Sequence, residues 1–167
     1  DKQAIAGLFV RQGETENSPV ANFGVARYLR NYGRENNVGI MLTHRFDEGS
    51  ETLGVASKHN STISIDGQIR PNSKWDLQYL LTPSIDEQTG ETGLAGGVFA
   101  GRSTSKLYLA WATEYTDERY NPGMGFVRQS NVIRHKPGGY YIWRPKKINW
   151  IWRWDPGLFA NYNQDAS

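Results

Sequence analysis

Cysteine is absent from this chain of 167 residues, and no apolar run approaches the length of a membrane-spanning helix. The first absence excludes disulfides, thiolate metal sites and cysteine nucleophiles. The second excludes a helical membrane protein, because such a helix needs about 20 consecutive apolar residues. An excess of one charge is also missing, since 19 basic and 17 acidic residues leave a net charge of +2. This balance lacks the basic field of a nucleic-acid-binding protein, so we expect no nucleic-acid partner.

Glycine and aromatic residues are abundant instead. The chain holds 18 Gly, 6 Trp, 9 Tyr and 6 Phe, although hydrophobic residues make up only 38% of it. This composition favours strands over helices. The length suits one domain that covers residues 1–167.

The segment 61–84 carries the clearest pattern, a strict alternation of apolar and polar residues on both sides of a turn signal. Its sequence is STISIDGQIRPNSKWDLQYLLTPS, with the turn at Pro71-Asn72-Ser73. Period-two alternation predicts strands with one apolar and one polar face. We therefore expect an antiparallel hairpin here.

Similar runs recur along the chain and predict about ten strands with no helix and no fixed-period repeat. For residues 22–30 a helix is the alternative. Turns are predicted at Asn36-Asn37 and over Lys136–Gly139. The fold class is all-β, an antiparallel meander. Besides the hairpin, strands are predicted over residues 4–12, 22–30, 37–46, 94–101, 107–115, 126–135, 140–143, 148–155 and 158–162.

Two architectures share this pattern. A soluble sandwich or barrel turns its apolar faces inward, whereas an outer-membrane β-barrel turns them to lipid and lines its lumen with polar residues. Runs of about 9 to 11 residues match a tilted strand that crosses a bilayer. Aromatic residues near strand ends are typical of interfacial girdles, although a soluble aromatic core would also use them. The charges on the opposite face suit a wet lumen or a solvated surface.

The barrel interpretation assigns residues to two surfaces. Lipid-facing or girdle positions are Ile63, Ile65, Ile69, Trp75, Tyr79, Trp111, Tyr115, Trp150, Trp152 and Trp154. Lumen-facing polar positions are Asp66, Arg70, Asp76, Glu114, Arg153 and Asp155. A basic ladder that biases a pore toward anions would consist of Arg27, Arg45, Arg70, Arg128 and Arg153. The alternative for these arginines is pairing with acids on neighbouring strands. The three alternating tryptophans 150, 152 and 154 have a sugar-stacking platform as their alternative.

Signatures of catalysis are missing. The chain has no G-x-S-x-G, H-E-x-x-H or P-loop motif, and His44, His59 and His135 are far apart in sequence. Asp66 and Asp76 could meet across their hairpin as a glycosidase pair, but lumen charges need no catalytic explanation. The acidic loops DEGSET and DEQTGET lack the spacing of a calcium motif. We expect no catalytic residue, no metal and no cofactor.

Several motifs in the chain resemble those of a bacterial family. In order, they are NFGVARYLRN (22–31), NVGIMLTHR (37–45), ISIDGQIRPNSKWDLQYLLTPS (63–84), YNPGMGFVRQSN (120–131) and IWRP (142–145). The chain resembles, from about Ala4 to about Pro156, the outer-membrane β-barrel region of large Gram-negative proteins. That region is a domain of unknown function that follows a family 9-like carbohydrate-binding domain. The resemblance implies a signal peptide and a carbohydrate-binding domain upstream, neither of which lies in this chain, so that the chain is a barrel or part of one.

The sequence therefore predicts a transmembrane outer-membrane β-barrel that acts as a pore or membrane anchor linked to glycan binding or to a larger envelope complex. The expected location is the bacterial outer membrane. Expected partners are outer-membrane lipid or lipopolysaccharide, a glycan and other envelope proteins. The alternatives are a soluble all-β carbohydrate-binding module and a glycoside hydrolase.

Overall fold

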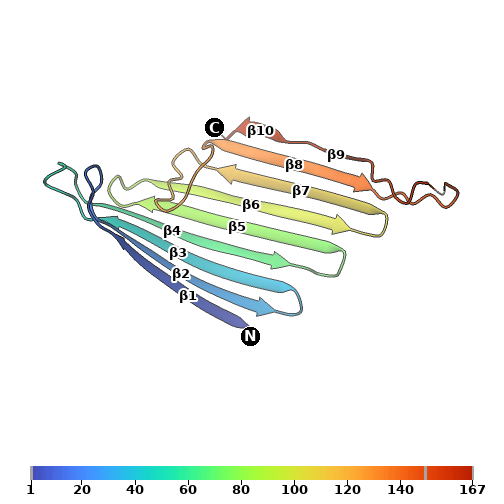
Figure 1. The fold of residues 1–167 in the computed structure, drawn as a ribbon, viewed down its shortest axis with the longest axis horizontal. Helices are drawn as coiled ribbons and strands as arrows, with labels where there is room; N and C mark the ends of the chain where they lie inside the picture. The colour runs from blue at the N-terminus through green and yellow to red at the C-terminus, as the bar shows by residue number, and fades with distance from the viewer. Residues whose placement is uncertain (1, 149, 167) are drawn as a thin grey trace.

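A computed structural model describes residues 2–148 and 150–166, which fold into one ten-stranded sheet with every neighbouring pair antiparallel (Figure 1). Strands β1 to β8 follow one another in chain order, and β9 and β10 both pair with β8. The strands are β1 (Gln3–Gln12), β2 (Ala21–Tyr32), β3 (Asn36–Asp47), β4 (Lys58–Ile69), β5 (Trp75–Asp86), β6 (Thr92–Ser103), β7 (Leu107–Thr116), β8 (Val132–Tyr141), β9 (Gly157–Phe159) and β10 (Tyr162–Asp165).

The predicted fold class, an all-β antiparallel meander of about ten strands, is confirmed. The sheet is open: among the described residues, the outer edge of β1 and the outer edges of β9 and β10 pair with no strand. No helix in the described part of the chain is long and apolar enough to cross a membrane. Residues 22–30 lie in a strand, so the helical alternative for them is wrong.

The predicted hairpin is formed by β4 and β5, with Ile65 opposite Leu81 and Gln68 opposite Gln78. The turn predicted at Asn36-Asn37 is wrong, because these residues begin β3 and the turn lies at 33–35. Gly33 adopts a φ of 64°, the left-handed conformation that a tight turn requires and that glycine adopts without strain.

The predicted turn over Lys136–Gly139 is also wrong, since β8 runs straight through it. Pro137 has no N–H, and it pairs with Ala160, which donates its own N–H to the Pro137 carbonyl over 2.9 Å. The return bond from Pro137 cannot form, and the ladder is interrupted at Ala160, between β9 and β10. Both short strands keep one register against β8, with Gly138 opposite Phe159 and His135 opposite Tyr162.

The strand predicted over residues 148–155 is not formed in the described residues of that segment. They belong to the connection between β8 and β9, in which Trp143 and Trp154 make an isolated bridge. The period-two spacing of tryptophans there arises in a loop that projects beyond the ends of the strands (Figure 1).

The connections differ in length between the two ends of the sheet. One end carries the compact turns 33–35, 70–74 and 104–106, together with the longer segment 142–156. The other end carries the loops 13–20, 48–57, 87–91 and 117–131. We call these the turn end and the loop end.

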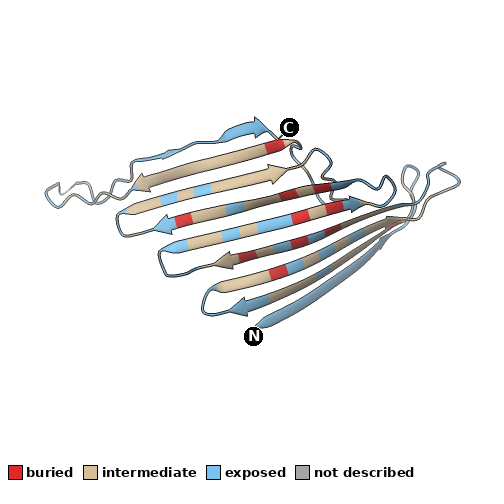
Figure 2. Ribbon diagram, turned by 180° about the vertical axis from the view of Figure 1, so that it is seen from behind, coloured by how far each residue is buried: buried red, intermediate tan, exposed pale blue. Residues whose placement is uncertain are grey.

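The described residues form a single-layered sheet without a hydrophobic core. The buried apolar side chains in the described part of the chain are those of Ala21, Ala95 and Val132, all small. The protein exposes 11699 Å², whereas a compact soluble protein of 18.9 kDa exposes about 8,300 Å². Burial concentrates in the middle strands, and β1, β9 and β10 are exposed throughout (Figure 2).

Candidate functional site: the polar face and its folded-in loop

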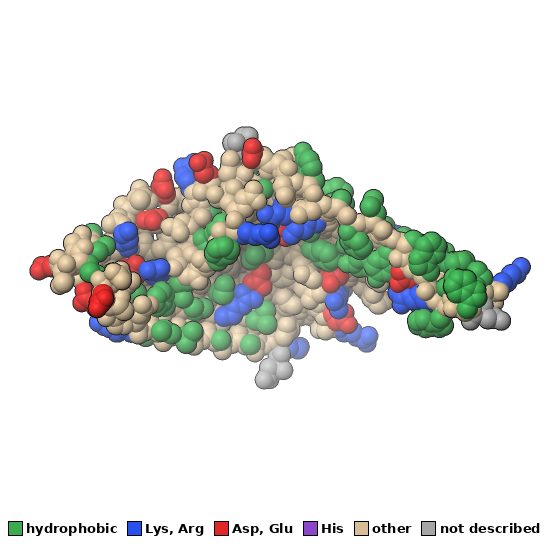
Figure 3. Space-filling model, turned by 45° about the horizontal axis from the view of Figure 1, so that its top comes forward, with side chains coloured by type: hydrophobic (Ala, Val, Ile, Leu, Met, Phe, Trp, Pro, Cys, Tyr) green, Lys and Arg blue, Asp and Glu red, His purple; other side chains and the backbone are tan. Residues whose placement is uncertain are grey.

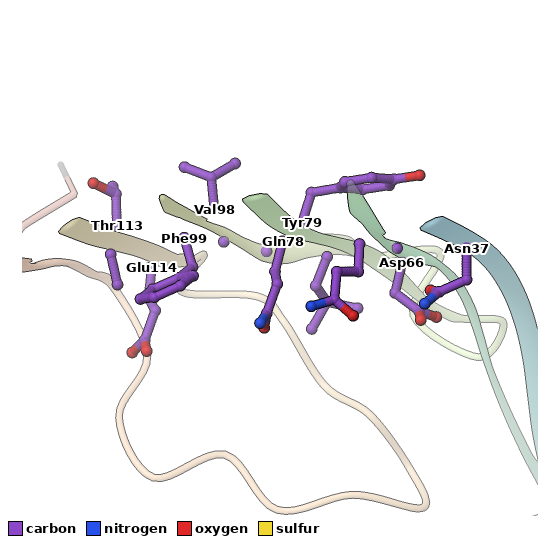
Figure 4. Close-up of a pocket in the computed structure, with 14 residues that line it drawn as sticks. Asn37, Asp66, Gln78, Tyr79, Val98, Phe99, Thr113 and Glu114 are labelled. Carbon is purple, nitrogen blue, oxygen red and sulfur yellow. The ribbon is translucent and has the colours of Figure 1, made fainter. Parts of the chain in front are cut away.

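Strand register separates the side chains into two faces. Residues directly opposite each other on paired strands share a face, and every second residue along a strand does so too. Asp66 is opposite Leu80, Leu80 is opposite Gly97, and Gly97 is opposite Glu114. Asp66, Asp76 and Glu114 therefore lie on one side, which we call the polar face. Figure 4 shows Asp66, Gln78 and Glu114 on the opposite side of the sheet from Val98 and Thr113.

An ion pair between β2 and β4 occupies the centre of the polar face. Arg27 donates from both terminal nitrogens to the two carboxylate oxygens of Asp66, with the Nη2 to Oδ2 bond at 2.7 Å. Strand β3 lies between them, and Gly39 leaves the space through which the guanidinium passes. A two-point pair of this kind fixes geometry as well as charge.

A second group of polar residues surrounds Asp76 near the turn end. Its carboxylate accepts hydrogen bonds from Gln68 at 2.8 Å, from Gln78 at 3.3 Å and from Arg70 at 3.3 Å. Arg70, in the turn after β4, also donates to Glu35 at 3.1 Å. The hydrogen bonds to Glu35 and Asp76, with Glu35 the larger effect, raise the pKa of Arg70 above its ordinary value.

Glu114 on β7 is paired as well. Its two carboxylate oxygens accept from Lys136 and from Arg134, the latter at 3.0 Å, and both bases lie on β8. Between these groups the polar face holds an open hollow of about 520 Å³. Asp66, Gln78, Phe99 and Glu114 are among its lining residues (Figure 4).

The loop 117–131, which connects β7 and β8, lies on the polar face. Asn60 on β4 holds it at two points, since its Oδ1 accepts from the Gly123 N–H at 2.6 Å and its Nδ2 donates to the Asn121 carbonyl at 2.8 Å. The Asn121 N–H donates to Ser84 Oγ on β5 at 2.9 Å. Arg45 on β3 donates to the Gly123 carbonyl at 3.3 Å.

This loop lies over the buried polar side chains of the described residues. Ser84 is only 2% exposed, and the other buried polar residues Thr62, Ser64 and Thr82 lie beside it on β4 and β5. Ser64 and Thr82 hydrogen-bond to each other at 2.8 Å. The best-packed region is thus the polar face at the loop end.

The opposite side of the sheet, which we call the apolar face, is uncovered. Val98 is 60% exposed and Ile65 is 43% exposed, although both lie within central strands. The predicted lipid-facing positions on strands all share this face by register: Ile63, Ile65, Ile69, Trp75, Tyr79, Trp111 and Tyr115. Large exposed side chains that share it include Ile40, Leu42, Leu81, Val98 and Leu109.

Trp150, Trp152 and Trp154 lie apart from both faces, in the segment 142–156. The rings of Trp143 and Trp154 meet edge to face with centroids 5.9 Å apart. Trp150 and Trp152 are 84% and 80% exposed, and these tryptophans line a shallow hollow of about 560 Å³. Apolar side chains gather at this end of the molecule (Figure 3).

Arg153 and Asp155, predicted to face a lumen, pair with each other in the same segment, with Nε to Oδ1 at 2.8 Å. This pair lowers the pKa of the Asp155 carboxyl and raises that of Arg153. Of the five arginines of the predicted ladder, Arg27, Arg45, Arg70 and Arg153 form ion pairs, and Arg128 lies exposed in the loop 117–131. These four are thus paired with acids, but only Arg70 pairs with an acid on the next strand, Asp76. Arg27 reaches an acid two strands away, and Arg45 and Arg153 pair within their own segments.

The residues considered for catalysis do not converge. Continued by one residue, the register of β4 and β5 places Asp76 opposite Arg70, which lies four residues after Asp66. At about 3.3 Å per residue, the two acids are separated by about 13 Å along the strand. A glycosidase pair requires roughly 5 to 9.5 Å. His44 and His59 approach with ring centroids 5.7 Å apart, but His135 packs near Trp111 instead. Within residues 2–148 and 150–166, no three ligating side chains form a metal cluster.

The anchors of the loop were not predicted from sequence. Asn60, Ser84 and Gly93 lie on three different strands, and only the folded sheet brings them beneath residues 120–123. The sequence motif NPGMG (121–125) indicates a turn, but it does not indicate that the loop folds back over the polar face.

Comparisons with protein-family models, with curated proteins and with solved structures returned no match to this chain. The resemblance to an outer-membrane family therefore stays a prediction.

Proposed function

We propose that this chain forms the wall of an outer-membrane β-barrel, with the apolar face toward lipid and the polar face lining an aqueous passage. The barrel serves as a pore or as the anchor of a glycan-binding or envelope complex. The observation that carries the proposal is the uncovered apolar face. A soluble monomer rarely exposes a continuous apolar patch of more than a few hundred Å². Here such side chains run across the strands from β3 to β7.

Energetics favour lipid as the cover of this face. Each Å² of apolar surface that stays in water instead of being buried costs about 25 cal/mol of stabilisation. A hydrocarbon solvent removes this cost without a second layer of protein. It also requires every backbone group to be paired, which a β-sheet provides everywhere except at its free edges.

Two further features support a membrane wall. Strands β1 to β8 each contain between 10 and 12 residues, enough for a tilted crossing of a bilayer. Three of the four connections at the turn end are compact and most of those at the loop end are longer, as in bacterial barrels, whose short turns face the periplasm; the segment 142–156 is the exception.

The polar face supports an aqueous lining. Its ion pairs, such as Arg27 with Asp66, are part exposed, with about 29% and 28% of each side chain accessible. Charges in such positions remain hydrated while the pairing balances them. A lipid-facing surface would not tolerate them.

Single cysteines on β4 and β5 test the orientation, since the native chain has no cysteine. Spin labels at Ile63 and Ile65 should be relaxed by lipid-soluble oxygen, and labels at Gln68 and Gln78, which line the open hollow, by a water-soluble nickel chelate. The purified protein should require detergent and migrate differently on gels after heating. Solubility without detergent, with all four positions equally accessible to the nickel chelate, would contradict the proposal.

A soluble carbohydrate-binding module is the second candidate, favoured by the exposed tryptophans of the segment 142–156. Indole rings stack on sugar faces, and four of them line one hollow. Titration with soluble oligosaccharides should then quench tryptophan fluorescence, and Trp152→Ala should weaken the effect. The same titration on detergent-free protein distinguishes this candidate from a membrane anchor.

A further inference from the structure

We propose that the loop 117–131 is an internal constriction of the passage, which limits the size of the solutes that cross. This inference rests on the proposed function. It follows from the direction in which the loop folds: the loop returns over the polar face of four strands that precede it, β3 to β6, instead of continuing off the loop end.

The reach of the loop is large enough to narrow a lumen. Its contacts extend from Arg45 on β3 to Gly93 on β6, three strand spacings or about 14 Å across the sheet. Tyr120 adds a contact to β5, where its hydroxyl is 3.4 Å from that of Thr82. Because the loop contacts four strands, its position along the axis of the passage is fixed.

Two glycines make this placement possible. A methyl group on Gly93 would overlap the backbone of Arg119 and Tyr120, so the loop rests directly on β6. A Cβ on Gly123 would lie 2.8 Å from the Cβ of Asn60. The backbone approaches the wall at both points more closely than any other residue type allows.

The part of the loop beyond these anchors projects from the wall. The Gly125 N–H donates to the Pro122 carbonyl at 2.8 Å and closes a tight turn. Phe126, which follows this turn, is 90% exposed. A bulky ring on a held turn reduces the open cross-section and offers an apolar contact to a passing solute.

The selection is by size rather than by charge. The acids of the strand wall beside the hollow are paired with bases, Asp66 with Arg27 and Glu114 with Arg134 and Lys136. The Arg27–Asp66 pair is neutral and the Glu114 group keeps one positive charge, so the net field along this wall is weak. The solutes that fit this passage are small, hydrophilic and without strong net charge, a class that includes short sugars.

The test compares the wild type with a variant whose loop is displaced. Gly93→Leu places a side chain where the Tyr120 backbone lies. Gly24→Leu is the matched control, because a Cβ at Gly24 meets its nearest atom only at 3.9 Å. The sheet is produced together with the further crossings that close its barrel, purified from the membrane and reconstituted into liposomes, and swelling rates are measured in sugars from mono- to tetrasaccharides.

A pair of spin labels reports loop position independently of transport. Phe126→Cys with Gln78→Cys places one label on the exposed part of the loop and one on the exposed polar face, and neither side chain anchors the loop. The distance between the labels should be sharply defined in the wild-type background and in Gly24→Leu, and longer or broadly distributed in Gly93→Leu.

The expected result is that Gly93→Leu admits a larger sugar than the wild type and swells several-fold faster, while Gly24→Leu keeps the wild-type limit. If Gly93→Leu lacks the gel shift of a folded barrel, Asn60→Ala with Ser84→Ala releases the same loop and takes its place. An unchanged size limit in a variant whose label distance shows a displaced loop overturns the constriction and leaves the barrel intact. Absence of swelling in every variant, with water-exposed labels at Ile63 and Ile65, overturns both proposals.

Discussion

Arg27 on β2 and Asp66 on β4 form a two-point ion pair across β3, which lies between their strands. The pair exists because Gly39, opposite Asp66, has no side chain: a Cβ there would overlap the guanidinium of Arg27. One glycine thus allows a charge on one strand to reach the second strand beyond it. The polar face is tied together across strands that share no backbone hydrogen bonds.

Removal of one member of this pair should destabilise the protein. Arg27→Met leaves the part-buried carboxylate without its donors, at a cost of about 1 to 3 kcal/mol. Adding Asp66→Asn should recover part of the loss, because an amide needs no counter-charge. Denaturant unfolding in micelles measures the double-mutant cycle. Arg11→Met is the control, since its pair with Glu48 is more exposed, and strictly additive effects of Arg27 and Asp66 would refute the coupling.

A lysine on the apolar face should be costly if that face meets lipid. Ile65→Lys is expected to lower the unfolding free energy in a bilayer by about 2 to 4 kcal/mol, the cost of a basic side chain near the membrane midplane. Gln68→Lys, on the polar face of the same strand, should change it by less than about 0.5 kcal/mol. Equal effects of the two lysines would argue for water on both sides.

Restoring an N–H at residue 137 should join β9 and β10. Pro137→Ala supplies the donor that the Ala160 carbonyl lacks, and the shared register of the two short strands needs no shift. We expect slower amide exchange at residues 160 and 161 and a gain of about 1 kcal/mol in stability. Exchange rates identical to those of the wild type would show that another constraint breaks the strand.

The start of the loop 117–131 should respond to acid only below the ordinary range of aspartate. The Asp117 carboxylate accepts the Arg119 N–H at 2.8 Å and the Tyr115 hydroxyl at 3.1 Å, and these bonds lower the pKa of Asp117. A lowered pKa stabilises the fold above the pKa of the unfolded chain, and this stabilisation is lost as the pH falls through the folded value. The Arg119 amide shift should therefore stay constant from pH 8 to about pH 5 and move below about pH 4. Asp117→Asn should abolish the movement.

Local patterns predicted the central strands well. In the hairpin of β4 and β5, the alternation of apolar and polar residues predicts that both segments are strands. It also predicts which side chains share a face, because alternate side chains of a strand point to opposite sides. The same rule placed Ile63 and Ile65 on the face opposite Asp66 before any pairing was known.

Other elements depend on contacts that a local pattern does not contain. Pro137 and the glycines after it read as a turn, yet β7 on one side supplies a continuous partner and keeps the strand extended. The tryptophans of 150–154 alternate like a strand, but the described residues of their segment form no strand ladder, and Trp154 pairs with Trp143 in an isolated bridge. The anchors Asn60 and Ser84 are 37 to 63 residues from their loop partners, so only the assembled sheet reveals them.

The interruption at Pro137 has a consequence for closure. Because β9 and β10 hold one register, they count as a single crossing, and the ten strands make nine crossings of alternating direction. An odd number means that β1 and the last crossing run the same way. Joining those two edges, or closing a ring from two copies inserted in the same orientation, would require parallel pairing at each junction. A barrel that is antiparallel throughout and contains this sheet must therefore have an odd number of crossings in addition to these nine.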